Sequence, residues 1–558
     1  MIERQQTTWL SGGLALVLLL ALLVLVILPL ALLFTHAVPQ TPAELDALRA
    51  RLAGPPLRDA LLHSLGVALL ACGLASALAI PAALVVVRRL PALRMPIGLL
   101  GLLPLAVPPF IGAALLDYFA PLYNASAGGA LLGRLDISGS SIALSVVYAA
   151  HYFPFMLFCL MAGLERVGPC LEESARNLGA GRLRVWGRIV LPLVMPAFVM
   201  GGALMVLRIL EDIGAPLVLG VDTLLAPQLL VRLGEAGPDD PQLVVTALAL
   251  FTAALIVSVL GWSTLLPPAV DERRAERGRP ASRGALTGLL AAPPLLLLTL
   301  VALLPLGGLL LLAPGAPWSA AVAPATDAPA DVFAVAGDAA TGLLYVVGTA
   351  LLVLLSALAA GAAATTRRPL ARLTRFAATL PFAVPGVVLA LAYLQLDNGL
   401  GDVRSGAQAL PWVALTLVVA FKQLPLAQRV LVGPMRRLHA GSLAAARGLG
   451  TAGPGHYLGT AAAALAGRMG ALLLLGAAAA ALELSAALVL FEGPEAPYAM
   501  ALFNLIRNGG STALWAMPGI ALAVAVALAL AVALFLLRRR GIASHRPVGR
   551  EQPAREQK

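Results

Sequence analysis

The sequence has 558 residues, of which 60% are hydrophobic and only 12% are charged, and its mean hydropathy is +0.90. A soluble protein of this length carries far more charge, so the composition excludes that class and indicates a polytopic membrane protein. The formal net charge of +11 does not indicate nucleic-acid binding, because the basic residues lie in short loops between apolar runs, as the positive-inside rule describes.

Twelve apolar runs are long enough to cross a hydrocarbon core of about 30 Å. In the first half of the chain they cover 9–34, 61–87, 95–116, 140–164, 189–215 and 241–265. In the second half they cover 286–312, 340–364, 376–396, 410–431, 468–490 and 513–537. The first run is too long for the core of a signal peptide and is predicted to be a retained helix. We expect an all-α membrane protein of about twelve transmembrane helices.

Arginine-rich loops alternate with more acidic ones along the chain. Arginines cluster at 88–94, 171–188, 273–283, 367–375 and in the basic tail 538–558. The rule that basic loops stay inside then places both termini in the cytoplasm of a bacterial inner membrane. The segment 266–285, rich in Pro, Arg and Glu, is predicted to be a flexible cytoplasmic linker.

The chain contains an internal repeat. LPLAVP at 103–108 recurs as LPFAVP at 380–385, and each half holds six predicted helices in the same orientation. Residues 1–265 and 286–537 therefore form two pseudo-symmetric halves, and repeats of this kind place a pathway at their interface. Pro108, Pro109 and Pro385 are expected to break or kink their helices, either as packing irregularities or as hinges near the pathway.

The polar segment 171–192 lies between two apolar runs. Leu171, Ala175 and Leu178 recur at helical spacing and form an apolar stripe that can enter a partner's groove. Gly179 is expected to end the first helix with a positive φ, and Pro192 to lie in the first turn of the next helix.

The spacing within this segment is specific. Glu173, Ser174 and Ala175, then Gly179, Ile189, Leu191 and Pro192, resemble the E-A-A-x3-G-x9-I-x-L-P signature of permease subunits of binding-protein-dependent ABC importers, with Ser174 in the usual place of Ala. The resemblance implies that 171–192 is a cytoplasmic coupling element that docks onto a separate ATPase subunit.

A degenerate copy covers 443–463. Ala444, Ala445 and Ala446 followed by Gly450 keep the Ala pair and the glycine spacing, but Ala444 replaces Glu and Thr460 replaces Ile. Docking of a second ATPase copy is still expected there, without an acidic anchor and therefore with unequal strength, unless the register in this half is different.

Three acids lie in apolar runs, where a charge is costly and usually pairs or faces a cavity. Arg208 can neutralise Glu211 at i+3 and Asp212 at i+4, whereas Glu483 has no opposite charge within a turn and Lys422 is a possible partner. We expect Glu483 to face the interface between the halves, across the pseudo-two-fold axis from Glu211 and Asp212.

EDIGAPLVLG at 211–220 and LELSAALVL at 482–490, together with both LPxAVP segments, resemble fused permeases of importers for ferric iron, thiamine and aminoethylphosphonate. The resemblance implies two ATPase copies and a periplasmic substrate-binding protein as partners. Two acids near the pathway would suit ferric iron, with aminoethylphosphonate, thiamine or a polyamine as alternatives.

No GxxxxGK[ST] phosphate loop and no nucleophile–base pattern occurs, so the chain is predicted to be neither its own ATPase nor an enzyme, and to need no cofactor. The six histidines show no metal-ligand spacing, and no metal site is predicted. An ion-gradient-driven secondary transporter of two six-helix halves is the alternative class. A structural subunit without a pathway is the third.

Overall fold

The computed structural model describes residues 2–35, 38–39, 41–126, 134, 136–167, 169–238, 240–263, 292–304, 339–364, 368–399, 410–448, 454–491 and 497–507. Within these ranges the chain is all helical, with no strand. The count of twelve membrane helices stays a prediction, because the run 513–537 and part of 286–312 lie outside the described residues.

The first half contains α1 (Ile2–Leu22), α2 (Leu28–Thr35), α3 (Pro42–Ala53), α4 (Pro55–Leu84), α5 (Arg94–Leu100), α6 (Pro109–Ala125), α8 (Ser141–Arg166), α9 (Pro169–Asn177), α10 (Arg182–Val185), α11 (Leu191–Leu210), α12 (Gly214–Val218), α13 (Leu225–Ala236) and α14 (Pro241–Ser263). The second half contains α18 (Ala339–Ala363), α19 (Arg368–Ala377), α20 (Gly386–Gly399), α21 (Leu410–Gly448), α22 (Pro454–Leu482), α23 (Ser485–Leu490) and α24 (Tyr498–Arg507). A further short apolar helix covers Ala292–Leu304.

Eight of the described helices are long and apolar enough to cross a membrane. They confirm most of the predicted runs, but the prediction of one helix over 95–116 is wrong. That run is divided into α5, a 3-10 turn (Pro104–Ala106) and α6, because Pro104, Pro108 and Pro109 cannot donate the backbone hydrogen bonds that a continuous helix needs. The run 376–396 is also broken, with a bend of 91° between its two parts.

The two LPxAVP segments have the same conformation. In each a 3-10 turn, Pro104–Ala106 or Leu380–Ala383, is followed by an extended valine, with φ −108° at Val107 and φ −97° at Val384. A new helix then begins, α6 in the first half and α20 in the second. The sequence repeat is therefore a structural repeat at this place.

Three π-helical turns each end two residues before a proline: Leu23–Ile27 before Pro29, Val85–Arg89 before Pro91, and Trp186–Val190 before Pro192. Proline lacks an N–H, and its ring collides with the carbonyl of residue i−4 in a regular helix. A wider turn with i→i+5 hydrogen bonds lets the helical path continue through Pro29 and Pro192, whereas the helix before Pro91 ends at Arg89.

The N-terminal segment packs against the second half of the chain. α1 contacts α18 and α19, and α2 contacts α20. The Tyr393 hydroxyl of α20 donates to the carbonyl of Leu25, whose usual helical donor would be the absent N–H of Pro29. The two halves are therefore interlocked.

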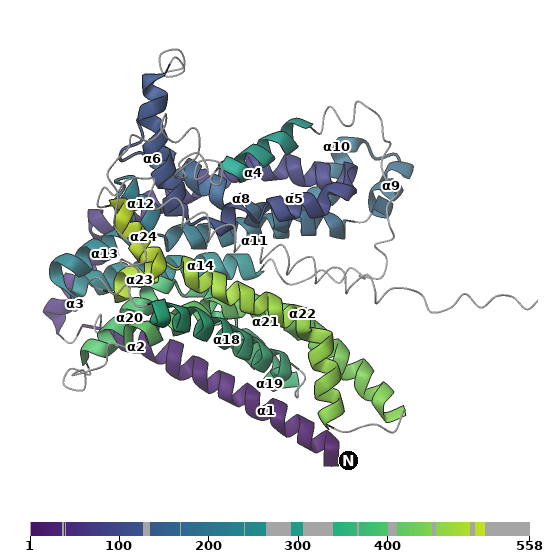
Figure 1. Cartoon of the computed structure of the whole chain (residues 1–558). Coiled ribbons are helices and arrows are strands. Elements are labelled where there is room, and N and C mark those ends of the chain that lie inside the picture. Colours follow the sequence, from purple (N-terminus) through teal and green to yellow (C-terminus); the bar gives the residue numbers. More distant parts are fainter. Residues whose placement is uncertain are drawn as a thin grey trace, which may run out of the picture.

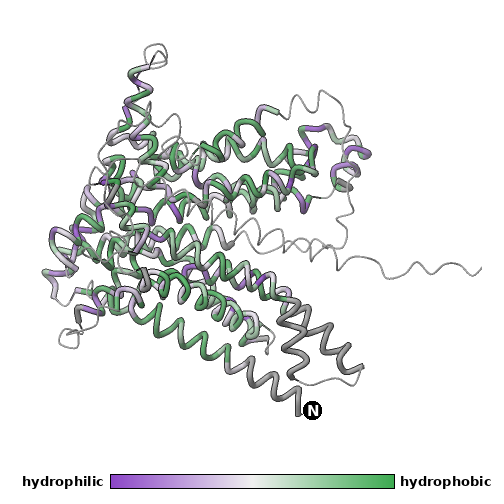
Figure 2. The backbone as a smooth tube through the Cα atoms, viewed as in Figure 1, coloured by the Kyte–Doolittle hydropathy of each residue, from purple (hydrophilic) through white to green (hydrophobic). Residues whose placement is uncertain are grey.

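Figure 1 draws the start of α1 and the helices α9 and α10 at the same end of the molecule, and α6, α12 and α13 at the opposite end. Figure 2 shows hydrophobic residues along the middle of the long helices and hydrophilic residues gathered at α9 and around the opposite end. An apolar band between two polar ends is the pattern expected of a protein that spans a bilayer.

Candidate transport pathway and coupling segment

Two helix breaks meet toward the end of the molecule that lies away from α9 and α10 (Figure 1). α11 ends at Leu210 and α12 begins at Gly214, while α22 ends at Leu482 and α23 begins at Ser485. Glu211 and Asp212 lie in the first break and Glu483 lies in the second. The acids thus occupy the non-helical corners of the chain, where backbone groups are free to bind side chains.

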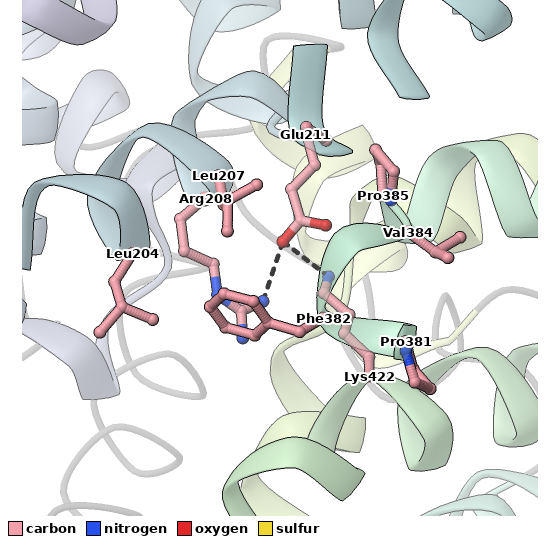
Figure 3. A pocket seen from close by; sticks show the side chains of 10 residues that line it. Leu204, Leu207, Arg208, Glu211, Pro381, Phe382, Val384, Pro385 and Lys422 are labelled. Atoms are coloured by element: carbon pink, nitrogen blue, oxygen red, sulfur yellow. Dashed lines mark hydrogen bonds and ion pairs between the residues drawn. The ribbon is translucent and has the colours of Figure 1, made fainter. Parts of the chain in front are cut away.

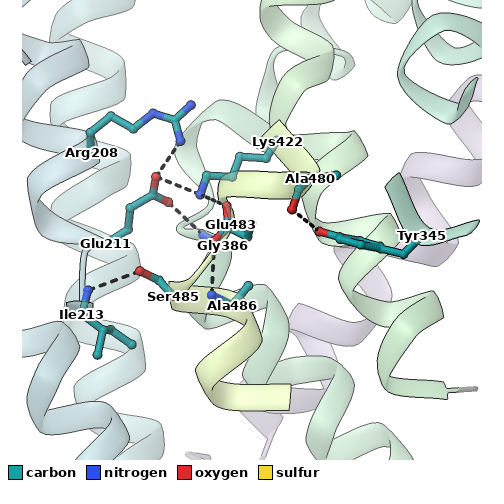
Figure 4. A network of polar contacts seen from close by, with 10 residues as sticks. All are labelled: Arg208, Glu211, Ile213, Tyr345, Gly386, Lys422, Ala480, Glu483, Ser485 and Ala486. Carbon is teal, nitrogen blue, oxygen red and sulfur yellow. Dashed lines mark hydrogen bonds and ion pairs between the residues drawn. The ribbon is translucent and has the colours of Figure 1, made fainter. Parts of the chain in front are cut away.

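Lys422 of α21 binds a carboxylate from each half. Its Nζ lies 3.0 Å from Glu211 Oε1 and 3.1 Å from Glu483 Oε2 (Figure 4). Arg208 lies 2.9 Å from the same Glu211 oxygen. Lys422 and the two glutamates are only 10–11% exposed, so these charges are compensated within the protein. The suggested Lys422–Glu483 pair is confirmed, and the Arg208–Glu211 pair is too.

Glu211 is also tied to the second half through the backbone. Its Oε2 accepts a hydrogen bond from the N–H of Gly386, the first residue of α20, at 3.1 Å. A Cβ at Gly386 would lie 3.2 Å from Lys422 Nζ, so the glycine leaves space for the lysine. The matching residue in the first LPxAVP segment is Pro109, which has no N–H to offer.

Asp212 does not pair with Arg208, contrary to the i+4 prediction. The helix ends at Leu210, so the spacing no longer places the two side chains on one face. Asp212 Oδ2 instead accepts hydrogen bonds from the Tyr148 hydroxyl at 2.9 Å and from the N–H of Ala215 at 3.2 Å.

The interface between the breaks is tightly packed. The N–H of Ile213 donates to Ser485 Oγ at 3.2 Å. A Cβ at Gly214 would lie 2.5 Å from Leu484 Cδ2 and 3.1 Å from Phe110 Cβ, so only glycine permits this approach of α12 to both neighbours. Phe110 follows Pro108 and Pro109, which place the start of α6 beside α12.

A small cavity of about 30 Å³ lies beside the cluster (Figure 3). Its lining residues come from α11, α14, the second LPxAVP segment and α21: Leu204, Leu207, Arg208, Glu211, Ala254, Pro381, Phe382, Val384, Pro385 and Lys422. A cavity of this size holds about two water molecules. Of the predicted pathway residues, Glu211 and Pro385 line it, whereas Asp212, Glu483, Pro108 and Pro109 do not.

The predicted coupling segment is exposed at the far end of the first half (Figure 1). Gly179 has a φ of +83°, which confirms the predicted positive φ after α9. Leu178 is 88% exposed and Leu183 is 91% exposed, and Glu173 and Ser174 are exposed as well. Large apolar side chains at a polar end of the molecule are typical of a protein–protein docking surface.

Glu172, which the sequence reasoning missed, anchors this segment internally. It is buried and forms ion pairs with Arg88 at 2.6 Å and with Arg176 at 3.3 Å. The i,i+4 spacing of Glu172 and Arg176 was the one signal that could have indicated it. Glu173, by contrast, is exposed, and within the described residues no salt bridge involves it.

Pro192 lies in the first turn of α11, as predicted, but α11 follows directly on a π-helical turn and not on a loop. The helical path runs without a gap from Arg182 to Leu210, and Ile189 lies in its π-helical turn. Pro192 is therefore inside this path, where the widened turn before it replaces the missing hydrogen bond. One continuous element leads from the coupling segment to Glu211.

The second coupling segment differs in its backbone. α21 runs unbroken from Leu410 to Gly448 and includes Ala444, Ala445 and Ala446, whereas in the first half α8 ends at Arg166 before α9 begins. Gly450 lies outside the described residues.

The part of the chain that the structure describes is thus all helical, with eight apolar helices long enough to span a membrane, two helix breaks that carry buried acids, and an exposed segment around 173–183. The family of binding-protein-dependent transport system inner membrane components matches residues 75–272. The chain is 34% identical over 231 residues to the molybdenum transport system permease of Mycobacterium bovis, covering 83% of that protein and 39% of this chain. The chain belongs to this family of ABC importer permeases.

Other relatives match shorter stretches. The sulfate transport system permease of Salmonella typhimurium is 34% identical over 116 residues, which is 41% of that protein and 20% of this chain. The spermidine/putrescine transport system permease of the same species is 32% identical over 170 residues, which is 57% of that protein and 28% of this chain.

Proposed function

We propose that this chain is a fused permease, with two halves in one polypeptide that together form the solute pathway of an ATP-driven importer. A relative covered over 83% of its length matches only 39% of this chain, which leaves room for a second permease unit. The repeated LPxAVP conformation and the matching breaks after α11 and α22 support two units of the same design.

In this proposal solute arrives from a periplasmic binding protein and passes between the halves into the cytoplasm. Two copies of a separate ATPase dock at 171–192 and at 443–463. The observation that carries the proposal is the continuous helical path Arg182–Leu210, which joins the exposed docking segment directly to the buried cluster at Glu211. Both termini are placed on the cytoplasmic side with the docking segment.

The solute that we favour is an oxyanion. Relatives named for molybdenum and sulfate point to this class, since molybdenum dissolves in neutral water as an oxyanion. The prediction of ferric iron, based on two acids near the pathway, is not supported, because the relatives are named for other solutes and Arg208 and Lys422 balance Glu211 and Glu483. Because these four charges cancel, the cluster attracts neither an oxyanion nor ferric iron, and in this proposal the binding protein selects the solute. Spermidine or putrescine, named for another relative, is the polycationic rival.

The test is uptake into proteoliposomes that contain the chain with its ATPase and binding protein. We expect ATP-dependent uptake of labelled molybdate or sulfate that survives collapse of the ion gradients by an ionophore. ATP-dependent uptake of ferric iron or spermidine instead would overturn the solute assignment alone. Uptake that needs an ion gradient and no ATP would overturn the importer mechanism.

A further inference from the structure

Lys422 lies at the interface and forms ion pairs with carboxylates of both halves, Glu483 of its own half and Glu211 of the other. Glu483 belongs to the second half with Lys422, whereas Glu211 belongs to the first half with Arg208. The four side chains form one row, Arg208–Glu211–Lys422–Glu483, in which charges alternate (Figure 4). Within this row the central Glu211–Lys422 contact is the one that crosses between the halves, beside the backbone hydrogen bonds from Gly386 to Glu211 and from Ile213 to Ser485.

Separation at this central contact leaves one complete ion pair of the row on each side. Arg208 keeps Glu211 at 2.9 Å in the first half, and Lys422 keeps Glu483 at 3.1 Å in the second. An isolated charge in a buried site costs several kcal/mol, so a row that divides into two complete ion pairs avoids the largest penalty of opening. A single lysine–glutamate ion pair without Arg208 and Glu483 would leave an unpaired buried charge on each side after opening.

The position of the row suits a gate. It lies at the far end of the helix that starts at the docking segment, and 29 residues at about 1.5 Å each span roughly 40 Å. The adjoining cavity of about 30 Å³ is too small for a hydrated ion. The Glu211–Lys422 ion pair, the Ile213–Ser485 hydrogen bond and the close approach of Gly214 to Leu484 join the two halves here, at the end of the molecule away from α9 and α10 (Figure 1).

We propose that Lys422 is the gating residue of the pathway, and that it is held to Glu211 in the closed state and left with Glu483 alone in the open state. The proposal rests on the proposed passage of solute between the two halves. Gly386 leaves space for Lys422 and donates its N–H to Glu211. We therefore expect the Gly386–Glu211 hydrogen bond to break together with the Glu211–Lys422 ion pair.

The two glutamates then have opposite effects, although both contact the same lysine. Glu211→Gln removes the charge that holds Lys422 across the interface, and favours the open state. Glu483→Gln removes the partner that Lys422 needs after opening, and favours the closed state. A role limited to packing would make both substitutions loosen the same interface. Asp212→Asn is the matched control, because Asp212 is buried next to Glu211 but is bonded to Tyr148.

The experiment measures the distance between spin labels on opposite halves of the full chain in lipid nanodiscs, by pulsed electron paramagnetic resonance. Labels are placed at the exposed residues Asp222 and Leu396 after replacement of Cys72, Cys159 and Cys170. We expect Glu211→Gln to increase the longer-distance population at least twofold. We expect Glu483→Gln to reduce the longer-distance population. If the unsubstituted chain shows only the shorter label distance, Glu483→Gln should show only that distance too. Asp212→Asn should match the unsubstituted chain.

A shift in the same direction for both glutamate variants would overturn the gating role, as would the absence of any shift in Glu211→Gln. Size-exclusion profiles check that each variant is folded, and Glu211→Asp, which keeps the charge, provides a second variant whose distances should lie near those of the unsubstituted chain. The measurement needs no solute or ATPase. Failure of the uptake assay therefore counts against the proposed function, and failure of the distance shift against the gate alone.

Discussion

The break after α11 and the break after α22 share a backbone design but carry different charges. In each, a carboxylate accepts a hydrogen bond from the N–H three residues ahead, Asp212 from Ala215 and Glu483 from Ala486, both at 3.2 Å. Asp212 is then bonded to a neutral tyrosine of its own half, whereas Glu483 is bonded to Lys422. Glu211 has no acidic counterpart, since Leu482 stands in its place.

On the proposed fused architecture, this difference is what joining two repeats in one chain permits. In a symmetric homodimer each residue must serve both sides of the interface. In a single chain the repeats can diverge, so that one side supplies Glu211 and the other supplies Lys422 and Gly386. The coupling segments have diverged in the same sense, with Glu172 and Glu173 in the first and Leu443 and Ala444 in the second.

The largest expected effect comes from the coupling segments. Glu173→Lys should reduce uptake at least tenfold, because reversing an exposed charge opposite a basic partner costs on the order of several kcal/mol and tenfold corresponds to about 1.4 kcal/mol. Ala444→Lys, at the matching place, should reduce uptake less than about threefold because no acidic anchor is lost there. Uptake and ATPase co-purification are measured beside membrane abundance. Equal losses of uptake and ATPase binding in the two variants would contradict the predicted difference between the two coupling segments.

The next effect separates the two acids of the first break. Glu211→Gln should lower the thermal unfolding temperature clearly, because removing one member of a buried ion pair costs about 3–5 kcal/mol. Asp212→Asn should lower it much less, because the amide oxygen still accepts from Tyr148 and a hydrogen bond between neutral groups contributes about 1 kcal/mol. The unfolding of both variants is followed in the same detergent. A larger loss in Asp212→Asn would reverse the ranking of the two carboxylates.

Gly179 gives a smaller and more local test. Gly179→Val places a β-branched residue at a φ of +83°, whereas Gly181→Val places one at a φ of −65°. Neither position has a neighbour within 4 Å of the added Cβ, so the two variants differ in backbone strain and not in crowding. Strain of about 1–3 kcal/mol should weaken ATPase binding in the first variant only. Similar binding by both variants would show that the glycine conformation does not shape the docking surface.

The smallest effect is expected at Glu172. Glu172→Gln keeps a hydrogen-bonding side chain but removes the charge that pairs with Arg88 and Arg176, whose side chains are 23% and 50% exposed and therefore partly screened. Hydrogen exchange of α9 should become faster by a few-fold, with unchanged membrane abundance. Unchanged exchange would show that packing, rather than Arg88, positions α9.

The sequence predicted the features that depend on local chemistry. Apolar length located most of the spans, glycine chemistry gave the positive φ of Gly179, and the charges gave the pairs of Arg208 with Glu211 and Lys422 with Glu483. It failed where proline and tertiary contacts decide the backbone. The run 95–116 is broken at its prolines, whereas the helical path Arg182–Leu210 continues through Pro192 after a π-helical turn, and hydropathy cannot distinguish these two outcomes.

The remaining features depend on contacts between distant segments. The sequence spacing predicts that Asp212 pairs with Arg208. Because α11 ends at Leu210, Asp212 instead accepts a hydrogen bond from Tyr148, 64 residues away in the chain. Gly386 carried no signal of its role, because its N–H meets Glu211 only when the two halves pack together. A single lysine shared by two glutamates was likewise visible only in the folded chain.

The most direct test of the account is an electron cryo-microscopy structure of the chain with its ATPase, in nucleotide-free and ATP-bound states, at a resolution that shows Lys422. The account predicts that Lys422 lies within ion-pair distance of Glu483 in both states and of Glu211 only in the state with the outer end closed. A lysine that leaves Glu483 on opening, or a Glu483 carboxylate directed at lipid, would contradict it.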